Sequence, residues 1–288
     1  MLLVQLLRIR QYTKNLFVFA APLFAGTLLH TDIFLRCMVD FISFCCVASA
    51  VYIFNDIQDR EQDRRHPRKS QRPIACGRVS TRAAVVYALL LLSTGLIGAF
   101  LLASKEELGL LLLYIFLNIL YSLWGKYIVL LDVMLIAFGF VLRAFMGLYV
   151  IRAETTSWFL LCVFMLSLFL ALGKRRAELE TFGEDAIQQR GVLSGYSLAF
   201  IDQLLNIVAA MTMTSYTVFA SQQEHGHGAL VTPIFVTVPF VIYGIFRYLY
   251  LLHVKKQGGR PEEIFLRDKH IFITCMLFTA CVLFLRNI

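Results

Sequence analysis

Long runs of apolar residues, separated by short polar segments, recur along the whole chain of 288 residues. Several of these runs approach the length of about 20 residues that an α-helix needs to cross a bilayer. The pattern predicts about nine membrane-spanning helices, at residues 16–29, 34–54, 83–103, 108–123, 129–151, 158–172, 198–220, 233–252 and 271–285. We therefore expect an all-α fold, a polytopic helical bundle that forms a single membrane domain over residues 1–288.

Composition and charge support this reading and predict an orientation. Hydrophobic residues make up 59% of the chain and charged residues only 16%, which is too apolar for a soluble domain of this size. Most of the 27 Lys and Arg residues fall in every second polar segment, beginning with the N-terminal one, and short basic segments stay in the cytoplasm. We expect a protein integral to the cell (inner) membrane, with its N-terminus inside and its C-terminus outside. The first run lacks a small-residue cleavage site, so we expect a membrane helix there and no cleaved signal peptide.

The net charge of +8 reflects this asymmetry and favours anionic lipid headgroups and phosphorylated substrates as partners. No nucleic-acid partner is expected, because no recognition motif is present. The seven cysteines lie mostly in apolar runs without CxxC spacing, which predicts buried thiols. His225 and His227 could hold a metal in an outer loop, but an ordinary glycine-rich turn is the favoured interpretation. The sequence leaves the oligomeric state open, a homo-oligomer included.

The polar segment after the second run predicts a site for Mg²⁺ and a diphosphate. Asp56, Asp59 and Asp63 are three and four residues apart, so on a helix they share one face and can hold Mg²⁺. Asn55 adds a neutral oxygen ligand. Cations for the remaining phosphate oxygens follow at Arg64, Arg65, Arg68, Lys69, Arg72 and Arg78. A solvated basic loop would explain these cations, but it would not explain three acids on one face.

Two other predicted cytoplasmic segments carry candidate binding residues. Lys14 lies at the mouth of the first run, where the alternative is an interfacial anchor. Tyr121 and Lys126, followed by Asp132, join the fourth and fifth runs by a tight turn. The polar groups of this turn could reach a phosphate or a ribose hydroxyl.

Lys174, Arg175 and Glu178 end the sixth run. Their spacing of three and four residues also fits an ordinary solvated ion-pair face. Their position favours a binding role, because they follow the sixth run as the aspartates follow the second. Two half-sites on either side of a bundle are therefore expected.

Arg143 lies within the fifth run, on one face with Gly139 and Gly147. An arginine at this depth is costly without a partner or a wet cavity, while the small residues permit close helix packing. Arg143 is expected either to contact a ligand or to pair with an acid such as Asp40 or Asp202. The sequence favours neither alternative.

These motifs resemble those of the UbiA superfamily of intramembrane transferases, and within it the branch that moves phosphoribose onto a polyprenyl phosphate in cell-wall arabinan synthesis. The resemblance spans essentially the whole chain. It is carried by Gln11, Lys14 and Asn15; Asn55, Asp56, Asp59, Asp63, His66, Pro67, Lys69, Arg72, Pro73, Ile74, Ala75 and Gly77; Tyr121, Ser122, Lys126, Leu131 and Asp132; Gly139, Phe140, Leu142, Arg143 and Gly147; residues 174–179; and residues 258–263 with Asp268.

The resemblance implies a transferase with Mg²⁺ as cofactor, phosphoribosyl pyrophosphate as donor and a decaprenyl-like polyprenyl phosphate as acceptor, acting at the cytoplasmic face. It implies Asn55, Asp56, Asp59 and Asp63 as metal ligands, and Glu178 as a further catalytic carboxylate. Ile9 and Tyr12 depart from the family pattern, which has Pro and Trp there.

The basic motif at residues 174–179 replaces a second aspartate motif of the aromatic prenyltransferases. One acidic and one basic motif suit a donor with an additional phosphate away from the metal. The alternatives are a UbiA-type prenyltransferase that uses an isoprenyl diphosphate and an aromatic or lipid acceptor, and a transporter of a phosphorylated metabolite.

Overall fold

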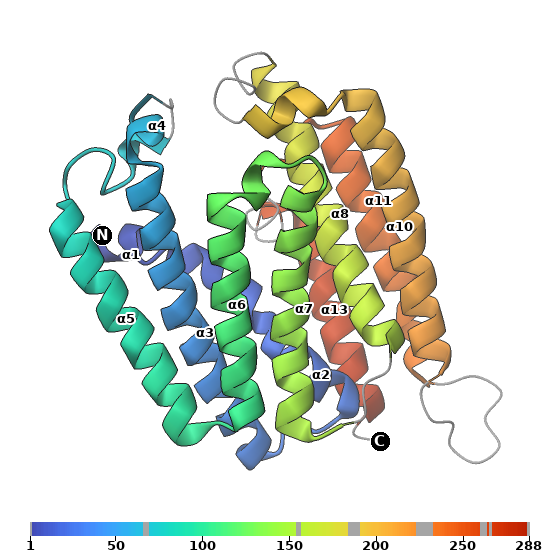
Figure 1. The fold of residues 1–288 in the computed structure, drawn as a ribbon. Helices are drawn as coiled ribbons and strands as arrows, with labels where there is room; N and C mark the ends of the chain where they lie inside the picture. Colours follow the sequence, from blue (N-terminus) through green and yellow to red (C-terminus); the bar gives the residue numbers. More distant parts are fainter. Residues whose placement is uncertain are drawn as a thin grey trace.

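The computed structural model describes residues 2–65, 69–153, 157–183, 191–222, 233–259, 264 and 267–286. Every element assigned in these residues is a helix, which confirms the predicted all-α fold (Figure 1). Eight stretches of the described residues are long and apolar enough to cross a membrane. They are α3 (Thr31–Gln58), α5 (Thr81–Leu102), α6 (Lys105–Leu123), α7 (Leu131–Ile151), α8 (Ser157–Phe182), α10 (Leu198–Ser221), η5 (Pro233–Thr237) with α11 (Val238–His253), and α13 (Lys269–Arg286).

Parts of the predicted motifs fall outside the described residues. These parts are residues 66–68, the histidine loop at 224–228 and residues 260–263, together with the side chain of Arg65.

The first predicted span, residues 16–29, differs from the prediction of a membrane helix. After α1 (Leu2–Leu6) the chain forms a 3-10 helix of 11 residues, η1 (Ile9–Phe19), and then a short helix, α2 (Ala20–Ala25). Pro22 has no backbone N–H to continue a long helix, and Gly26 ends α2 with a φ of 73°. A 3-10 helix rises about 2.0 Å per residue, so η1 alone covers about 22 Å.

This N-terminal segment runs from one end of the bundle to the other. Arg8, just before η1, contacts Asp56 near the end of α3. At the other end, a Cβ on Gly26 would lie 3.0 Å from Arg286 in the last helix. Figure 1 accordingly shows the N-terminus towards the end that carries α4 (Arg60–Arg65), and the C-terminus at the opposite end.

The orientation of this bundle can be tested with single cysteines in a Cys76→Ser background, because Cys76 is itself exposed. Gln71 is exposed on η2 (Lys69–Gln71), and Glu106 is exposed at the α5–α6 connection. We expect an impermeant maleimide to label Gln71→Cys only in inverted vesicles and Glu106→Cys in intact cells. Labelling of Gln71→Cys in intact cells would overturn the predicted orientation.

The helix α7 joins the two halves of the bundle. Its Val133 packs into an apolar core built mainly from α8, α10 and α11, whereas its Leu142 and Met146 pack with α3 and α6. It also lies tightly against η1, because a Cβ on Gly147 would come within 2.1 Å of the Val18 carbonyl oxygen. The N-terminal end of α7 lies against α8, because its Asp132 accepts a hydrogen bond from Arg175.

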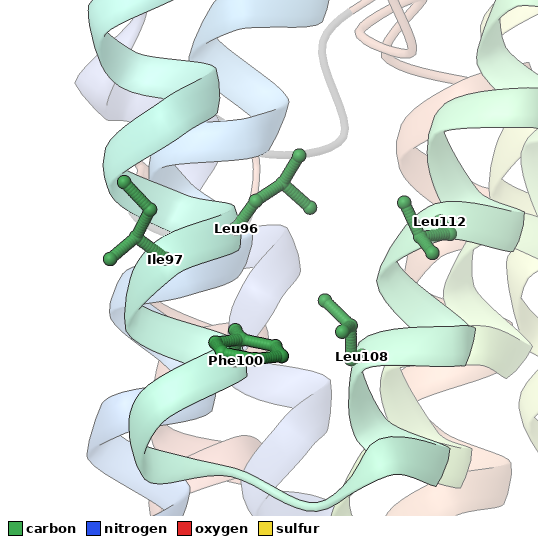
Figure 2. Close-up of a pocket in the computed structure, with 5 residues that line it drawn as sticks. All are labelled: Leu96, Ile97, Phe100, Leu108 and Leu112. Carbon is green, nitrogen blue, oxygen red and sulfur yellow. The ribbon is translucent and has the colours of Figure 1, made fainter.

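A pocket of about 300 Å³ lies between α5 and α6, close to the connection that joins them (Figure 2). It is lined by Leu96, Ile97, Phe100, Leu108 and Leu112, all of them apolar. The α5–α6 connection beside this pocket lies at the end of the bundle away from α4 (Figure 1). The lining of this pocket offers no group for acid–base, metal or phosphate chemistry. The candidate site therefore lies at the opposite end of the bundle, where α3 meets α4, which we call the polar end.

Candidate active site

The aspartate motif lies where α3 ends. Asp59 separates α3 from α4. The turn stays close to helical, because the N–H of Asp59 donates to Asn55 O at 2.9 Å and the N–H of Asp63 to Asp59 O at 2.8 Å. Asp56 and Asp63 are each only 3% exposed. The motif therefore presents two buried carboxylates and one more accessible carboxylate.

Arg72 connects the two buried acids. Its Nη1 lies 2.9 Å from Oδ1 of Asp56 and 2.6 Å from Oδ2 of Asp63. Arg8 also donates to Oδ1 of Asp56. Burial raises the pKa of Asp63, and the positive charge of Arg72 opposes that shift. A single cationic nitrogen of Arg72 thus lies between the two carboxylates and bridges them.

Asp59 meets a different cation. The Nζ of Lys126, on η3 (Gly125–Tyr127), donates to Oδ1 of Asp59 at 2.8 Å, and Ser122 donates to Oδ1 of Asn55. Burial lowers the pKa of Lys126, but the hydrogen bond and charge of Asp59 raise it overall, so the amine is protonated. The prediction of three acids on one face holds only in part, because Asp56 and Asp63 share Arg72 whereas the carboxylate of Asp59 contacts the α6–α7 turn.

The donor set fits Mg²⁺. Asn55, Asp56, Asp59 and Asp63 offer only oxygen ligands, which Mg²⁺ prefers. The two buried carboxylates need a neighbouring cation, since an unpaired charge away from water is costly. Within the described ranges, no three His, Cys, Asp or Glu side chains converge closely enough to form a metal cluster as they stand. Binding of a metal would therefore require the ion pairs of Arg72 and Lys126 with these acids to break.

The basic motif near the end of α8 forms buried ion pairs. Arg175 is 2% exposed, and it donates from Nε to Oδ2 of Asp132 at 2.8 Å and from Nη1 to Oε2 of Glu178 at 3.0 Å. Arg176 pairs with Asp202 at 2.6 Å. Because Asp132 and Asp202 come from other helices, their pairs with Arg175 and Arg176 join helices. The Arg175–Glu178 pair is the contact within one helix that the three-residue spacing allowed. A contact of Arg175 with a phosphate stays a prediction.

Asp132, which we predicted to reach a substrate phosphate or hydroxyl, is fully buried. Its Oδ1 accepts from the hydroxyl of Tyr196 at 2.8 Å, and its Oδ2 accepts from Arg175. Both carboxylate oxygens of Asp132 thus have partners within the protein, and a direct contact of Asp132 with substrate stays a prediction. Tyr196, which follows η4 (Gly191–Gly195), was missed by the sequence analysis. It lies 64 residues from Asp132, and no local pattern distinguishes it.

Arg143 has no carboxylate partner in the described part of the chain. Its Nε donates to Oδ1 of Asn15 at 2.7 Å, its Nη2 to the hydroxyl of Tyr114 at 2.9 Å, and its Nη1 to the carbonyl oxygen one turn earlier at 2.6 Å. Three aromatic rings also lie 4.7 to 5.4 Å from its guanidinium carbon. The expected pairing with Asp40 or Asp202 is wrong, because η1 approaches α7 closely enough to supply a neutral partner.

The remaining candidates lie around these groups. Tyr121, on α6, is near enough to Arg175 to interact electrostatically, and Lys69 is similarly near to Asp63. Arg64 donates to the carbonyl oxygen of Ala75 at 3.0 Å. Lys174 on α8 and Lys14 on η1 are half-buried. The structure therefore brings the aspartate motif, the α6–α7 turn and the basic motif to one end of the bundle.

Comparison with known proteins assigns the chain to a family. Residues 15–267 match the UbiA prenyltransferase family. The chain belongs to the UbiA family. Curated relatives include the decaprenyl-phosphate phosphoribosyltransferases of Corynebacterium glutamicum and Mycolicibacterium smegmatis, each 32% identical over 97% of this chain. The similarity covers 85% and 90% of those two proteins, so it extends over nearly their whole length.

Solved UbiA structures share the fold. A UbiA homolog from Archaeoglobus fulgidus bound to GPP and Mg²⁺ is similar with a TM-score of 0.74 and 20% identity, over 99% of both chains. The same homolog bound to DMAPP and Mg²⁺ gives a TM-score of 0.77 and 18% identity, over 100% of both chains. The predicted UbiA-like bundle is thereby confirmed.

Proposed function

We propose that this UbiA protein transfers 5-phosphoribose from phosphoribosyl pyrophosphate to a decaprenyl-like polyprenyl phosphate and releases pyrophosphate. The observation that carries the proposal is the 32% identity, over nearly the whole length, to two proteins named decaprenyl-phosphate phosphoribosyltransferase. The family match includes both polar motifs.

The charges at the polar end support a donor with two separate phosphate groups. The aspartate motif suits a diphosphate held through Mg²⁺, and the basic motif suits a further phosphate at the other end of the sugar. Phosphoribosyl pyrophosphate carries both, whereas an isoprenyl diphosphate has no second anionic end. Lys174 and Lys69 are the candidates for direct contact with the 5-phosphate, since Arg175 is buried and already paired with Asp132 and Glu178.

In the proposed reaction the difficult step is the departure of pyrophosphate. The chemistry therefore depends on stabilisation of this leaving group and does not need a strong base. Mg²⁺ held by Asn55, Asp56, Asp59 and Asp63 would neutralise charge on the departing pyrophosphate. Arg72 and Lys126 lie beside the same acids and would donate charge-assisted hydrogen bonds to diphosphate oxygens. The acceptor phosphate is already an anionic nucleophile at neutral pH.

Glu178 is the candidate carboxylate for positive charge that develops at ribose C1. Its side chain is 24% exposed, whereas Asp132, the other acid on Arg175, is fully buried. The site lies at the end of the bundle that we expect to face the cytoplasm. A soluble donor would enter there, while the tail of the lipid acceptor remains in the bilayer.

The assay that tests this proposal supplies purified protein with ribose-labelled phosphoribosyl pyrophosphate, polyprenyl phosphate and Mg²⁺. A labelled lipid should form, unlabelled donor should compete, and geranyl diphosphate should not. A chelator should stop the reaction and added Mg²⁺ should restore it. Consumption of an isoprenyl diphosphate without binding of phosphoribosyl pyrophosphate would favour a prenyltransferase, and uptake into liposomes without turnover would favour a transporter.

A further inference from the structure

The turn between α6 and α7 is held by a tyrosine from a distant loop. The hydroxyl of Tyr196 donates to Oδ1 of Asp132 at 2.8 Å and accepts from the backbone N–H of Leu130 at 2.8 Å. Leu130 has a φ of 68°, a conformation that residues other than glycine rarely adopt. Such strain persists only where the surroundings hold the residue in place. The Tyr196 hydroxyl is one of the groups that do so.

The position of this hydroxyl is itself fixed by packing. Tyr196 is 6% exposed, and its ring stacks on Phe200 with 6.4 Å between centroids. The preceding residue, Gly195, lies so close to Val129 that a Cβ would come within 2.4 Å of a Val129 methyl group. The loop that carries Tyr196 is thus pressed against the residue just before Leu130.

From this turn, contacts lead to both polar motifs. On one side, Lys126 precedes Leu130 by four residues and donates to Asp59 of the aspartate motif. On the other side, Asp132 accepts from Arg175, which in turn donates to Glu178. The hydroxyl of Tyr196 therefore contacts the segment that joins the aspartate motif to the basic motif.

We propose that Tyr196 is a positioning residue that sets the spacing between the aspartate motif and the basic motif. This inference rests on the proposed function, because it assumes that one donor spans both motifs. Without the hydroxyl, the Leu130 N–H and one oxygen of Asp132 lose their partner, and the turn relaxes. Lys126 and the basic motif that Arg175 anchors are then held at the wrong separation for the two ends of the donor, which weakens donor binding.

The test compares Tyr196→Phe with Tyr216→Phe in the purified full-length protein. Both changes keep the ring and remove a buried hydroxyl, but Tyr216 bonds Thr237 in another part of the bundle. The Tyr196 hydroxyl makes two hydrogen bonds, and loss of the net stabilisation of even one corresponds to about a fivefold to tenfold change in an equilibrium constant. We expect Tyr196→Phe to raise the KM for phosphoribosyl pyrophosphate by about that factor and to leave the KM for polyprenyl phosphate unchanged. Tyr216→Phe should leave both KM values unchanged.

A double variant distinguishes positioning from a general loss of stability. If Tyr196 acts through Asp132, adding Tyr196→Phe to an Asp132→Asn protein should raise the donor KM much less than it does in the unmodified protein. An unchanged donor KM in Tyr196→Phe, or the same rise in Tyr216→Phe, would overturn the inference. A failure of the unmodified protein to form labelled lipid would instead count against the proposed function.

Discussion

Asp56→Asn is expected to reduce phosphoribosyl transfer by roughly 10²–10³-fold, the loss typical when electrostatic stabilisation of a transition state is removed. Asparagine keeps the shape of the side chain and can still accept hydrogen bonds from Arg8 and Arg72, but it loses the charge that a metal requires. The bundle should therefore remain folded. Initial rates at saturating substrates, together with the melting temperature, measure the two effects separately.

Glu61→Gln provides the matched control. Glu61 lies on α4 between Asp59 and Asp63, but its side chain is 73% exposed and pairs at the surface, with Arg60 and Arg64. Removing its charge should change the rate by less than about twofold, since surface changes of this kind have small effects. Near-normal activity in folded Asp56→Asn protein would show that the buried acids serve another purpose than metal binding.

The helices of the bundle were predictable because a bilayer imposes a simple condition on the chain. Backbone groups in hydrocarbon must be satisfied within the segment, so a run of about 20 apolar residues has to be a helix. The run at residues 83–103 accordingly became Thr81–Leu102, and the run at 271–285 became Lys269–Arg286. In the same way, helical period predicted that Asp56 and Asp63 lie close together, two turns apart.

The pairing of polar groups was not predictable. The helical repeat tells which residues share one face of a helix, but it does not tell which other helix packs against that face. Lys126 and Asp59 are 67 residues apart, and Arg143 and Asn15 are 128 residues apart. Both contacts depend on the packing of separate segments. The 3-10 conformation of η1 was not predicted for a similar reason. An apolar run does not distinguish a 3-10 helix that packs against α7 from an α-helix. The partners of Arg175 and Arg143 therefore required the structure.

Arg143→Met is expected to lower the free energy of unfolding by about 2–4 kcal/mol. Three hydrogen bonds of the guanidinium are lost, two to other segments and one to a carbonyl oxygen of α7 itself. Each is worth roughly 0.6 kcal/mol, and cation–π contacts add about 0.5–2 kcal/mol. The change also leaves Asn15 and Tyr114 without their buried donor. Unfolding in detergent measures this effect. Donor KM should change little, whereas a ligand contact of Arg143 would raise donor KM in a protein of normal stability.

Two further variants decide whether these hydrogen bonds hold η1 against α7. Arg143→Met combined with Asn15→Leu should be more stable than Arg143→Met alone, because replacing both partners by apolar groups leaves no unsatisfied amide oxygen there. Arg152→Met removes an exposed arginine just after the same helix and should cost less than about 0.5 kcal/mol. If Arg143→Met is as stable as Arg152→Met, the arginine does not hold η1, and its burial requires a role at a ligand.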